Sequence, residues 1–356
     1  MDEIGVALLG YGLAGSVFHA PLIAATQGLR LRAVVTNDPR RKLQVERDFP
    51  QVRSVPTLEG LLQDAADIGL VVIATPNHMH LSQATAALAQ GLHVVVDKPM
   101  ALSSAEASAM IAAAQRSGRL LSVFQNRRFD NDYLLVRQLI ADHRIEAVRH
   151  FESRFERWRP ELRPASWREE QPPEEGGGLL LDLGSHLIDQ ALLLFGRPLA
   201  VYAELATRRQ GAQADDDCFI ALSFEGGMSA HLWMSAVAPC AGPRFRIFGN
   251  SAALEVWGLD PQESQLASGL RPGQIGFGHR GQDQSAELIE NGGRPGTGKV
   301  LPFPAGSYAT FYRTMAEAIR GEAEVPVAPE EAASVLRVIE GARTSAAGRK
   351  PVTTGV

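Results

Sequence analysis

The sequence predicts two domains: an amino-terminal α/β domain with a doubly wound parallel sheet, and a carboxy-terminal α+β domain built on an open, largely antiparallel sheet. The length is the first reason, because 356 residues exceed the roughly 100–200 residues of one ordinary domain. Residues 1–123 alternate short apolar runs with helical patterns, which favours a parallel sheet with helices on both faces. Residues 124–356 instead contain consecutive strand-like runs with turn signals, which favours antiparallel pairing.

Short apolar runs in the first domain predict five strands, and helical patterns separate them. The strands are expected at Ile4–Leu9, Leu31–Val35, Leu70–Ala74, His93–Val96 and Leu120–Phe124. The helices are expected at Pro21–Thr26, Pro39–Phe49, Leu58–Ala65, Leu81–Gln90 and Ser104–Arg116. Strands this apolar are typical of a parallel sheet that is buried on both faces.

The second domain has a different order of elements. A helix over Tyr133–Ala141 and a strand over Ala147–Phe155 come first, and three glycines then open an apolar helix, Leu179–Phe195. Further strands are expected at Val201–Thr207, Phe219–Phe224, Met228–Ala236 and Phe245–Gly249, and two last helices at Tyr308–Arg320 and Pro329–Ala346. Residues Gly258–Pro304, rich in glycine and proline, predict a long segment without regular structure, which is usually functional or mobile.

Charge and cysteine content argue against several classes of function. A formal net charge of −5 argues against a basic nucleic-acid-binding surface. Cys218 and Cys240 are too few for a disulfide framework and lack the spacing of a zinc site, so no metal is expected. The amino terminus lacks the features of a signal peptide, and no run approaches the roughly 20 apolar residues of a membrane span. We therefore expect a cytoplasmic protein without nucleic-acid or membrane partners.

A G-x-G-x-x-G sequence directly follows the first strand and precedes a helix, which is the context of a dinucleotide-binding turn. Gly10 permits the tight turn, Gly12 lets the backbone approach a pyrophosphate, and Gly15 allows the helix to pack closely on the strand. The helix amino terminus presents free N–H groups to the phosphates, and Leu13 and Ala14 belong to the same expected site.

The end of the second strand selects the dinucleotide, because an acidic residue there would bind the ribose hydroxyl of NAD. If Thr36 holds this position, no carboxylate opposes a 2′-phosphate. The residues that can bind this phosphate are Asn37, Arg40, Arg41 and Lys42. This favours NADP(H) over NAD(H). The alternative is that Asp38 binds the ribose of NAD and that the basic residues are an ordinary solvated helix start.

Polar residues also follow the next two strands, at the edge where ligands collect in such sheets. The first group is Thr75, Pro76, Asn77 and His78. Asn77 offers donors and acceptors to a ribose or a carboxamide. His78 and His80 are more typical of structural or substrate-edge groups than of a metal site. Lys98 ends the following strand, where its ammonium can orient a hydroxyl or stabilise an alkoxide, although a lysine there is often only a surface charge.

Asp182 and His186 lie four residues apart near the start of the apolar helix, which places them on one face. A histidine with a near-neutral pKa can take the proton of an alcohol as hydride leaves, and a nearby carboxylate can orient the ring or the substrate. The alternative for this pair is a helix cap and a core histidine.

Four motifs, in this order and at these separations, resemble the glucose-fructose oxidoreductase / inositol dehydrogenase / rhizopine catabolism (Gfo/Idh/MocA) family over essentially the whole chain. They are Gly10–Gly15, Ala74–His80, Asp97–Pro99 and Gly176–Asp189. Further stretches are similar to the branch that contains NADP-dependent scyllo-inositol dehydrogenases. These are Phe18–Pro21, Val123–Phe129 and Phe155–Pro160.

The resemblance implies a Rossmann domain, an open-faced sheet domain that commonly mediates homo-oligomerisation, and reversible oxidation of a ring hydroxyl. It implies catalytic and substrate-orienting roles for Lys98, Asp182 and His186. Asp97 departs from the family, which more often has Glu there. Substrate contacts are expected from Asn126, Arg127 and Arg128, and pocket walls or interface packing from Trp158, Arg159 and Trp167. The first expected substrate pair is scyllo-inositol and its inosose. The alternatives are an aldose or anhydro-ketose enzyme, or a non-catalytic dinucleotide sensor.

Overall fold

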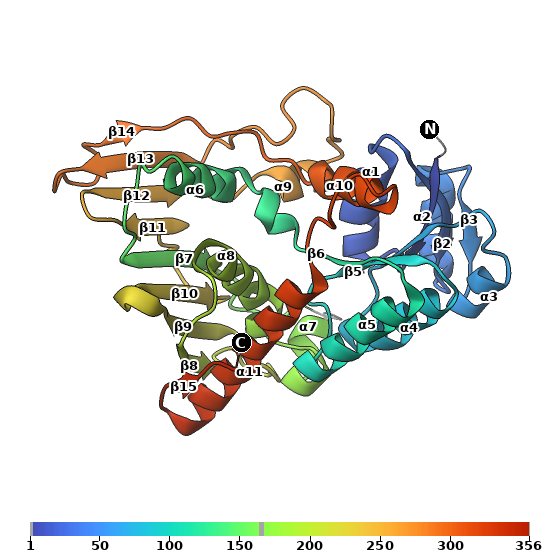
Figure 1. The fold of residues 1–356 in the computed structure, drawn as a ribbon, viewed down its shortest axis with the longest axis horizontal. Coiled ribbons are helices and arrows are strands. Elements are labelled where there is room, and N and C mark those ends of the chain that lie inside the picture. The colour runs from blue at the N-terminus through green and yellow to red at the C-terminus, as the bar shows by residue number, and fades with distance from the viewer. Residues whose placement is uncertain (1–2, 164–166, 356) are drawn as a thin grey trace.

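The computed structural model describes residues 3–163 and 167–355, and its two sheets lie side by side in Figure 1. The first sheet has six strands in the order β3-β2-β1-β4-β5-β6. They are β1 (Ile4–Leu9), β2 (Leu29–Val35), β3 (Arg53–Val55), β4 (Leu70–Ile73), β5 (His93–Asp97) and β6 (Leu121–Phe124). All their pairings are parallel, so the doubly wound sheet is confirmed. Only β3, three half-buried residues, was not predicted.

The helices of the first domain follow the predicted order. They are α1 (Ala20–Ala24), α2 (Pro39–Asp48), α3 (Leu58–Gln63), α4 (His80–Ala89) and α5 (Ser104–Ser117). The predicted start at Pro21 is wrong, because a π-helical segment, η1 (Ala14–His19), precedes α1 without a break. The wide turn lets the Ala20 N–H donate to the carbonyl of Gly15. Pro21 lacks an N–H and is tolerated in the first turn of α1.

The second sheet has nine strands in the order β14-β13-β12-β11-β7-β10-β9-β8-β15. They are β7 (His150–Glu156), β8 (Ala200–Ala206), β9 (Asp217–Ser223), β10 (Ser229–Ser235), β11 (Phe245–Phe248), β12 (Ala252–Trp257), β13 (Ser285–Glu290), β14 (Lys299–Val300) and β15 (Val352–Thr353). Strands β7 and β10 pair in parallel, whereas the other described pairings of this sheet are antiparallel.

Residues Gly258–Pro304 do contain regular structure, contrary to the prediction. They include β13, β14 and a short helix, α9 (Gln262–Ala267). Strand β13 buries Ala286 and Leu288 against the core and pairs along its whole length with β12. The surrounding glycines and prolines hide this short alternation in the sequence, because they dominate the local turn signal.

Helices cover one face of the second sheet, and the last two return to the first domain (Figure 1). The remaining described helices are α6 (Asn131–Ala141), α7 (Trp167–Glu170), α8 (Ser185–Phe195), α10 (Ala309–Ile319) and α11 (Pro329–Gly348), with a π-helical segment η5 (Leu180–Gly184) before α8. Short 3₁₀ turns are η2 (Asn77–Met79), η3 (Asn126–Phe129), η4 (Pro173–Glu175) and η6 (Glu225–Gly227). In the described part of the chain, no helix is both long and apolar enough to cross a membrane.

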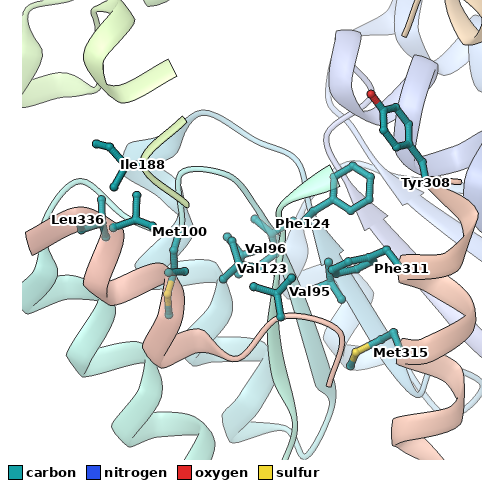
Figure 2. Close-up of a cluster of buried hydrophobic side chains, with 14 of the residues drawn as sticks. Val95, Val96, Met100, Val123, Phe124, Ile188, Tyr308, Phe311, Met315 and Leu336 are labelled. Carbon is teal, nitrogen blue, oxygen red and sulfur yellow. The ribbon is translucent and has the colours of Figure 1, made fainter. Parts of the chain in front are cut away.

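A hydrophobic core shared by the two domains holds their relative position. Figure 2 shows Phe311 of α10 pointing toward Val95 and Phe124 at the edge of the first sheet, with the Phe124 and Phe311 ring centroids 5.0 Å apart. On the other side of the same cluster, Leu336 of α11 lies close to Met100, which follows β5. Because these side chains are nearly fully buried, the carboxyl ends of β5 and β6 are fixed against the second domain.

The glycine turn after β1 is tightly constrained. Gly10 has a φ of +89°, and a Cβ there would lie 2.6 Å from the carbonyl oxygen of Ala74. We expect Gly10→Ala to lower the free energy of unfolding by more than Gly118→Ala, measured by urea denaturation. Gly118 also has a positive φ, of +62°, but open space around it, so its substitution should cost only the about 1–2 kcal/mol of left-handed backbone. Equal losses would contradict this steric interpretation.

Candidate active site

A cavity of about 230 Å³ lies where the carboxyl ends of β5 and β6 meet the start of η5 and α8. It therefore has walls from both domains, as expected for a ligand site at the edge of an open α/β sheet. The predicted site residues that line it are Leu13, Ala14, Lys98, Asn126, Arg127, Arg159, Asp182 and His186.

Lys98 and Asp182 form an ion pair that joins the two domains inside this cavity. The Lys98 ammonium donates to the Asp182 carboxylate, with Nζ 2.7 Å from Oδ1, and to the Asp182 backbone carbonyl at 2.8 Å. Only 12% of the Lys98 side chain is exposed. A charge-assisted hydrogen bond of this length in a partly buried site fixes the direction of the ammonium group.

His186 is buried at the cavity wall and is kept neutral by its surroundings. Its Nδ1 lies 3.1 Å from Oε1 of Gln125. An Nδ1–H that donates to this amide oxygen leaves Nε2 as the proton-accepting nitrogen. Burial lowers the pKa of His186 well below 6.5, and the neighbouring cations Lys98 and Arg127 lower it further. The neutral ring is the form that a general base requires.

The glycine turn fits a dinucleotide phosphate. Besides the left-handed Gly10, the turn contains Gly15, where an added Cβ would overlap the Gly10 carbonyl. A Cβ on Gly12 would point toward the guanidinium of Arg41, with Nη2 3.8 Å away. A cation beside a glycine turn at a helix start is the chemistry that binds a phosphate group.

Asp38, the acidic residue that follows β2 in the sequence, is already engaged by its neighbours. Asp38 caps α2 by accepting the Arg40 N–H at 2.9 Å, and it also pairs with the side chains of Arg40 and Arg41. The backbone hydrogen bond from Arg40 lowers the pKa of Asp38. Asn37 is exposed and Thr36 is half-buried, with the Thr36 Oγ1 accepting the Asp38 N–H. Asp38 thus has a structural role that the alternative NAD interpretation did not include.

The residues after β4 are not among those that line the cavity. The Thr75 hydroxyl donates to Gln83, Pro76 precedes η2, and His78 is exposed. Asn77 is buried next to Gly176 of the second domain. His80 is fully buried, and its ring nitrogens contact backbone carbonyls, which fits the structural interpretation of that residue.

Arg128 and Trp158 are not brought to the cavity. The Arg128 guanidinium makes two hydrogen bonds to Asp189, at 2.7 and 2.6 Å, and a third to Glu331 at 2.7 Å. Because all three of its nitrogens already donate to these carboxylates, the expected substrate contact of Arg128 has no support. Trp158 is 59% exposed outside the cavity. The side chain of Trp167 lies outside the described residues.

Several residues at the cavity were not predicted as site residues. Gln125 forms the hydrogen bond with His186. Its position directly after β6, at the edge of the sheet where ligands collect, could have identified it as a site residue. His19 lines the cavity with Nδ1 2.5 Å from the Tyr312 hydroxyl oxygen and Nε2 3.8 Å from Asp97. Arg209 lines the cavity from the loop after β8, and no local pattern marks it.

Two family models match the chain. The model described as "Oxidoreductase family, NAD-binding Rossmann fold" matches residues 4–125, and the model described as "Oxidoreductase family, C-terminal alpha/beta domain" matches residues 137–354. Together with the relatives below, they define the class as NAD(P)-dependent dehydrogenases that act on CH–OH groups. The chain belongs to the Gfo/Idh/MocA oxidoreductase family.

Similar proteins match nearly the whole chain. The scyllo-inositol 2-dehydrogenase (NADP(+)) IolW of Bacillus subtilis is 37% identical over 99% of this chain and 96% of its own length. The uncharacterized oxidoreductase YdgJ of Escherichia coli is 39% identical over 95% of each chain. A crystal structure from Klebsiella pneumoniae, 40% identical, has a TM-score of 0.90 and covers 99% of this chain and 96% of the other.

Proposed function

We propose that this protein transfers a hydride between NADP(H) and a ring hydroxyl or ketone of a polyol or sugar, with scyllo-inositol and its inosose as the first pair to test. The observation that carries the proposal is the convergence of Lys98, Asp182 and neutral His186 on one cavity beside a phosphate-binding glycine turn. The similarity to a dehydrogenase named for scyllo-inositol and NADP(+) supports the choice of substrate and cofactor.

NADP(H), when bound, accepts or supplies the hydride. Gly10 and Gly12, with the N–H groups of Leu13 and Ala14, would hold its pyrophosphate. During oxidation, His186 Nε2 accepts the proton of the reacting hydroxyl; in the reverse direction it returns that proton to the ketone oxygen.

Lys98 and Asp182 act on the same oxygen through charge. The Lys98 ammonium stabilises the negative charge that develops on the oxygen as its proton leaves. Asp182 holds the ammonium in place through two acceptors, its carboxylate and its carbonyl. This arrangement argues against the non-catalytic sensor, because a sensor does not require these groups.

Within the class of substrates, two alternatives differ in their products. Oxidation of a cyclitol yields an inosose, whereas oxidation of an aldose at its anomeric carbon yields a lactone. An anhydro-ketose would be reduced. The cavity residues fit any of these rings, so product analysis decides among them.

We also propose a homo-oligomer that forms through the open face of the second sheet, in the cytoplasm. This face carries half-buried aromatic side chains, including His150, Phe219, His231 and Trp233. The ring centroids of His150 and His231 are 4.6 Å apart. Aromatic residues that are only half covered in the monomer are typical of protein interfaces.

Purified protein should reduce NADP⁺ in the presence of scyllo-inositol, measured by absorbance at the reduced-nicotinamide band. Myo-inositol, glucose and NAD⁺ are run in parallel, and the product is identified.

His186→Ala should lower kcat by about 10²–10⁴ because general-base assistance is lost, while NADPH binding persists. Full turnover in His186→Ala would remove His186 from the mechanism, and tight NADPH binding without turnover of any ring would favour the sensor.

The pH dependence follows from the lowered pKa of His186. Because the neutral base is already formed at pH 6.5, kcat/KM for alcohol oxidation should not fall on account of His186 until the pH drops well below 6.5. Ketone reduction needs the protonated ring, so its rate should rise as the pH falls through the same pKa. Profiles in both directions test this, and an acidic limb for oxidation at pH 6.5 or above would contradict it.

Arg41 is the residue expected to select NADP(H), together with Arg40, Thr36, Asn37 and Lys42. Arg41→Ala should raise KM for NADP⁺ about tenfold or more, because hydrogen bonds to charged groups contribute about 1.5–3 kcal/mol. KM for NAD⁺ should change little. Arg47→Ala, in the same helix and likewise paired with an acid, Asp48, is the matched control. Equal effects of Arg41→Ala on both dinucleotides would refute the selector.

A further inference from the structure

One wall of the cavity carries an excess of positive charge. Arg157, Arg159 and Arg163 line it from the end of β7 and the loop that follows. Within residues 3–163 and 167–355, no carboxylate lies within 4.0 Å of any of these three guanidinium groups. The whole protein has a net charge of −5, so this wall does not reflect a generally basic chain.

The other arginines in and around this cavity have acidic partners. Arg127 pairs with Asp130 and Glu263, at 3.3 and 2.7 Å. Arg209 pairs with Glu169 and Asp216, both at 3.0 Å. The same rule holds deeper in the second domain for Arg128, Arg154, Arg244 and Arg246. Arg157 and Arg159 differ from these paired arginines, because in the described residues no ion pair engages their guanidinium groups.

Arg157 is held in place by an aromatic ring rather than by an acid. Its guanidinium lies 4.6 Å from the centroid of the Phe155 ring, and the guanidinium of Arg127 lies at the same distance from that ring. Burial contributes most to lowering the pKa of Arg157. The carboxylates of Glu263 and Asp182 favour its charged form, whereas the cations Arg127 and Arg163 disfavour it. A cation in this position gains most from an anion that arrives with a ligand.

We infer that the substrate ring carries an anionic group, a carboxylate or a phosphate, and that Arg157 binds it with help from Arg159 and Arg163. This inference rests on the proposed function and refines it: within that class, acidic sugars or polyols should react better than neutral rings such as scyllo-inositol. The guanidinium fork matches the two oxygens of either group. The cavity, at about 230 Å³, is smaller than the roughly 300–1,000 Å³ of pockets for drug-sized ligands, which suits a single ring.

The cofactor is a less suitable source of this anion. Its phosphates are expected at the glycine turn and at Arg41, which belong to the first domain. The three arginines belong to the second domain, on the side of Asp182 and His186. The test below separates the two sources by measuring cofactor affinity directly.

The experiment compares matched rings with NADP⁺: glucuronate against glucose, and myo-inositol 1-phosphate against myo-inositol. In the wild type, kcat/KM for at least one anionic ring should exceed that of its neutral partner by about tenfold or more. Arg157→Gln should lower this anionic-to-neutral ratio about tenfold, the effect of losing one charge-assisted hydrogen bond. Arg313→Gln, an exposed arginine on α10, is the control and should leave the ratio unchanged. The Kd of NADP⁺, from titration calorimetry, should be the same in wild type and Arg157→Gln.

Two results would overturn the inference. One is a neutral ring preferred by the wild type, with a ratio that Arg157→Gln does not change. The other is a tenfold weaker NADP⁺ complex in Arg157→Gln, which would assign the arginine to the cofactor. If no ring is oxidised, the proposed function fails, and calorimetric titration of the NADP⁺ complex with the same four compounds still decides the inference. Preferential binding of the anionic rings then supports it, and equal or absent binding refutes it.

Discussion

The ion pair between Lys98 and Asp182 is the contact on which the rest of the site depends. It connects the end of β5 in the first sheet to η5 in the second domain, over a distance of 2.7 Å. A partly buried pair of this kind contributes little net stability, but removing one partner leaves an uncompensated charge. It therefore selects the relative placement of the domains in which His186, four residues after Asp182, reaches the cavity. The shared core around Phe124 and Phe311 makes that placement rigid.

The electrostatics of the cavity follow from which charges are paired. Lys98 is neutralised by Asp182 and Arg127 by two acids, yet the summed field of the cations still lowers the pKa of His186 after burial has done so. The base is thereby kept neutral, and among the described residues no carboxylate forms a hydrogen bond or ion pair with its ring. Its partner is the uncharged Gln125, which fixes the tautomer without raising the pKa. A carboxylate in that place would have favoured the protonated ring.

The features that could be predicted from the sequence are those that depend on local patterns and on motifs. The strands of the first sheet, the glycine turn and the convergence of Lys98, Asp182 and His186 all follow from short spacings and from the rule that parallel strands end at one edge. Pairings between distant residues were not accessible. Arg128 was expected at the substrate, yet it is bound by Glu331, 203 residues away. Strands β12 to β14 were missed because their stability comes from pairing with each other, and the glycines between them dominate the local signal.

The two segments that carry the functional backbone share an unusual geometry, because η1 and η5 are both π-helical. A π-helical turn has a longer hydrogen-bonded ring than an α-helix and is found mostly at functional sites. The π-helical segment η1 comes directly after the start of the glycine turn and continues into α1, which has Pro21 in its first turn. The segment η5 contains Asp182 and ends directly before Ser185, so the helix face predicted from regular spacing is only approximate there. Asp182 and His186 still line one cavity. The Asp182 carbonyl, as well as its carboxylate, accepts a hydrogen bond from Lys98. In a regular α-helix this carbonyl would accept the N–H four residues later.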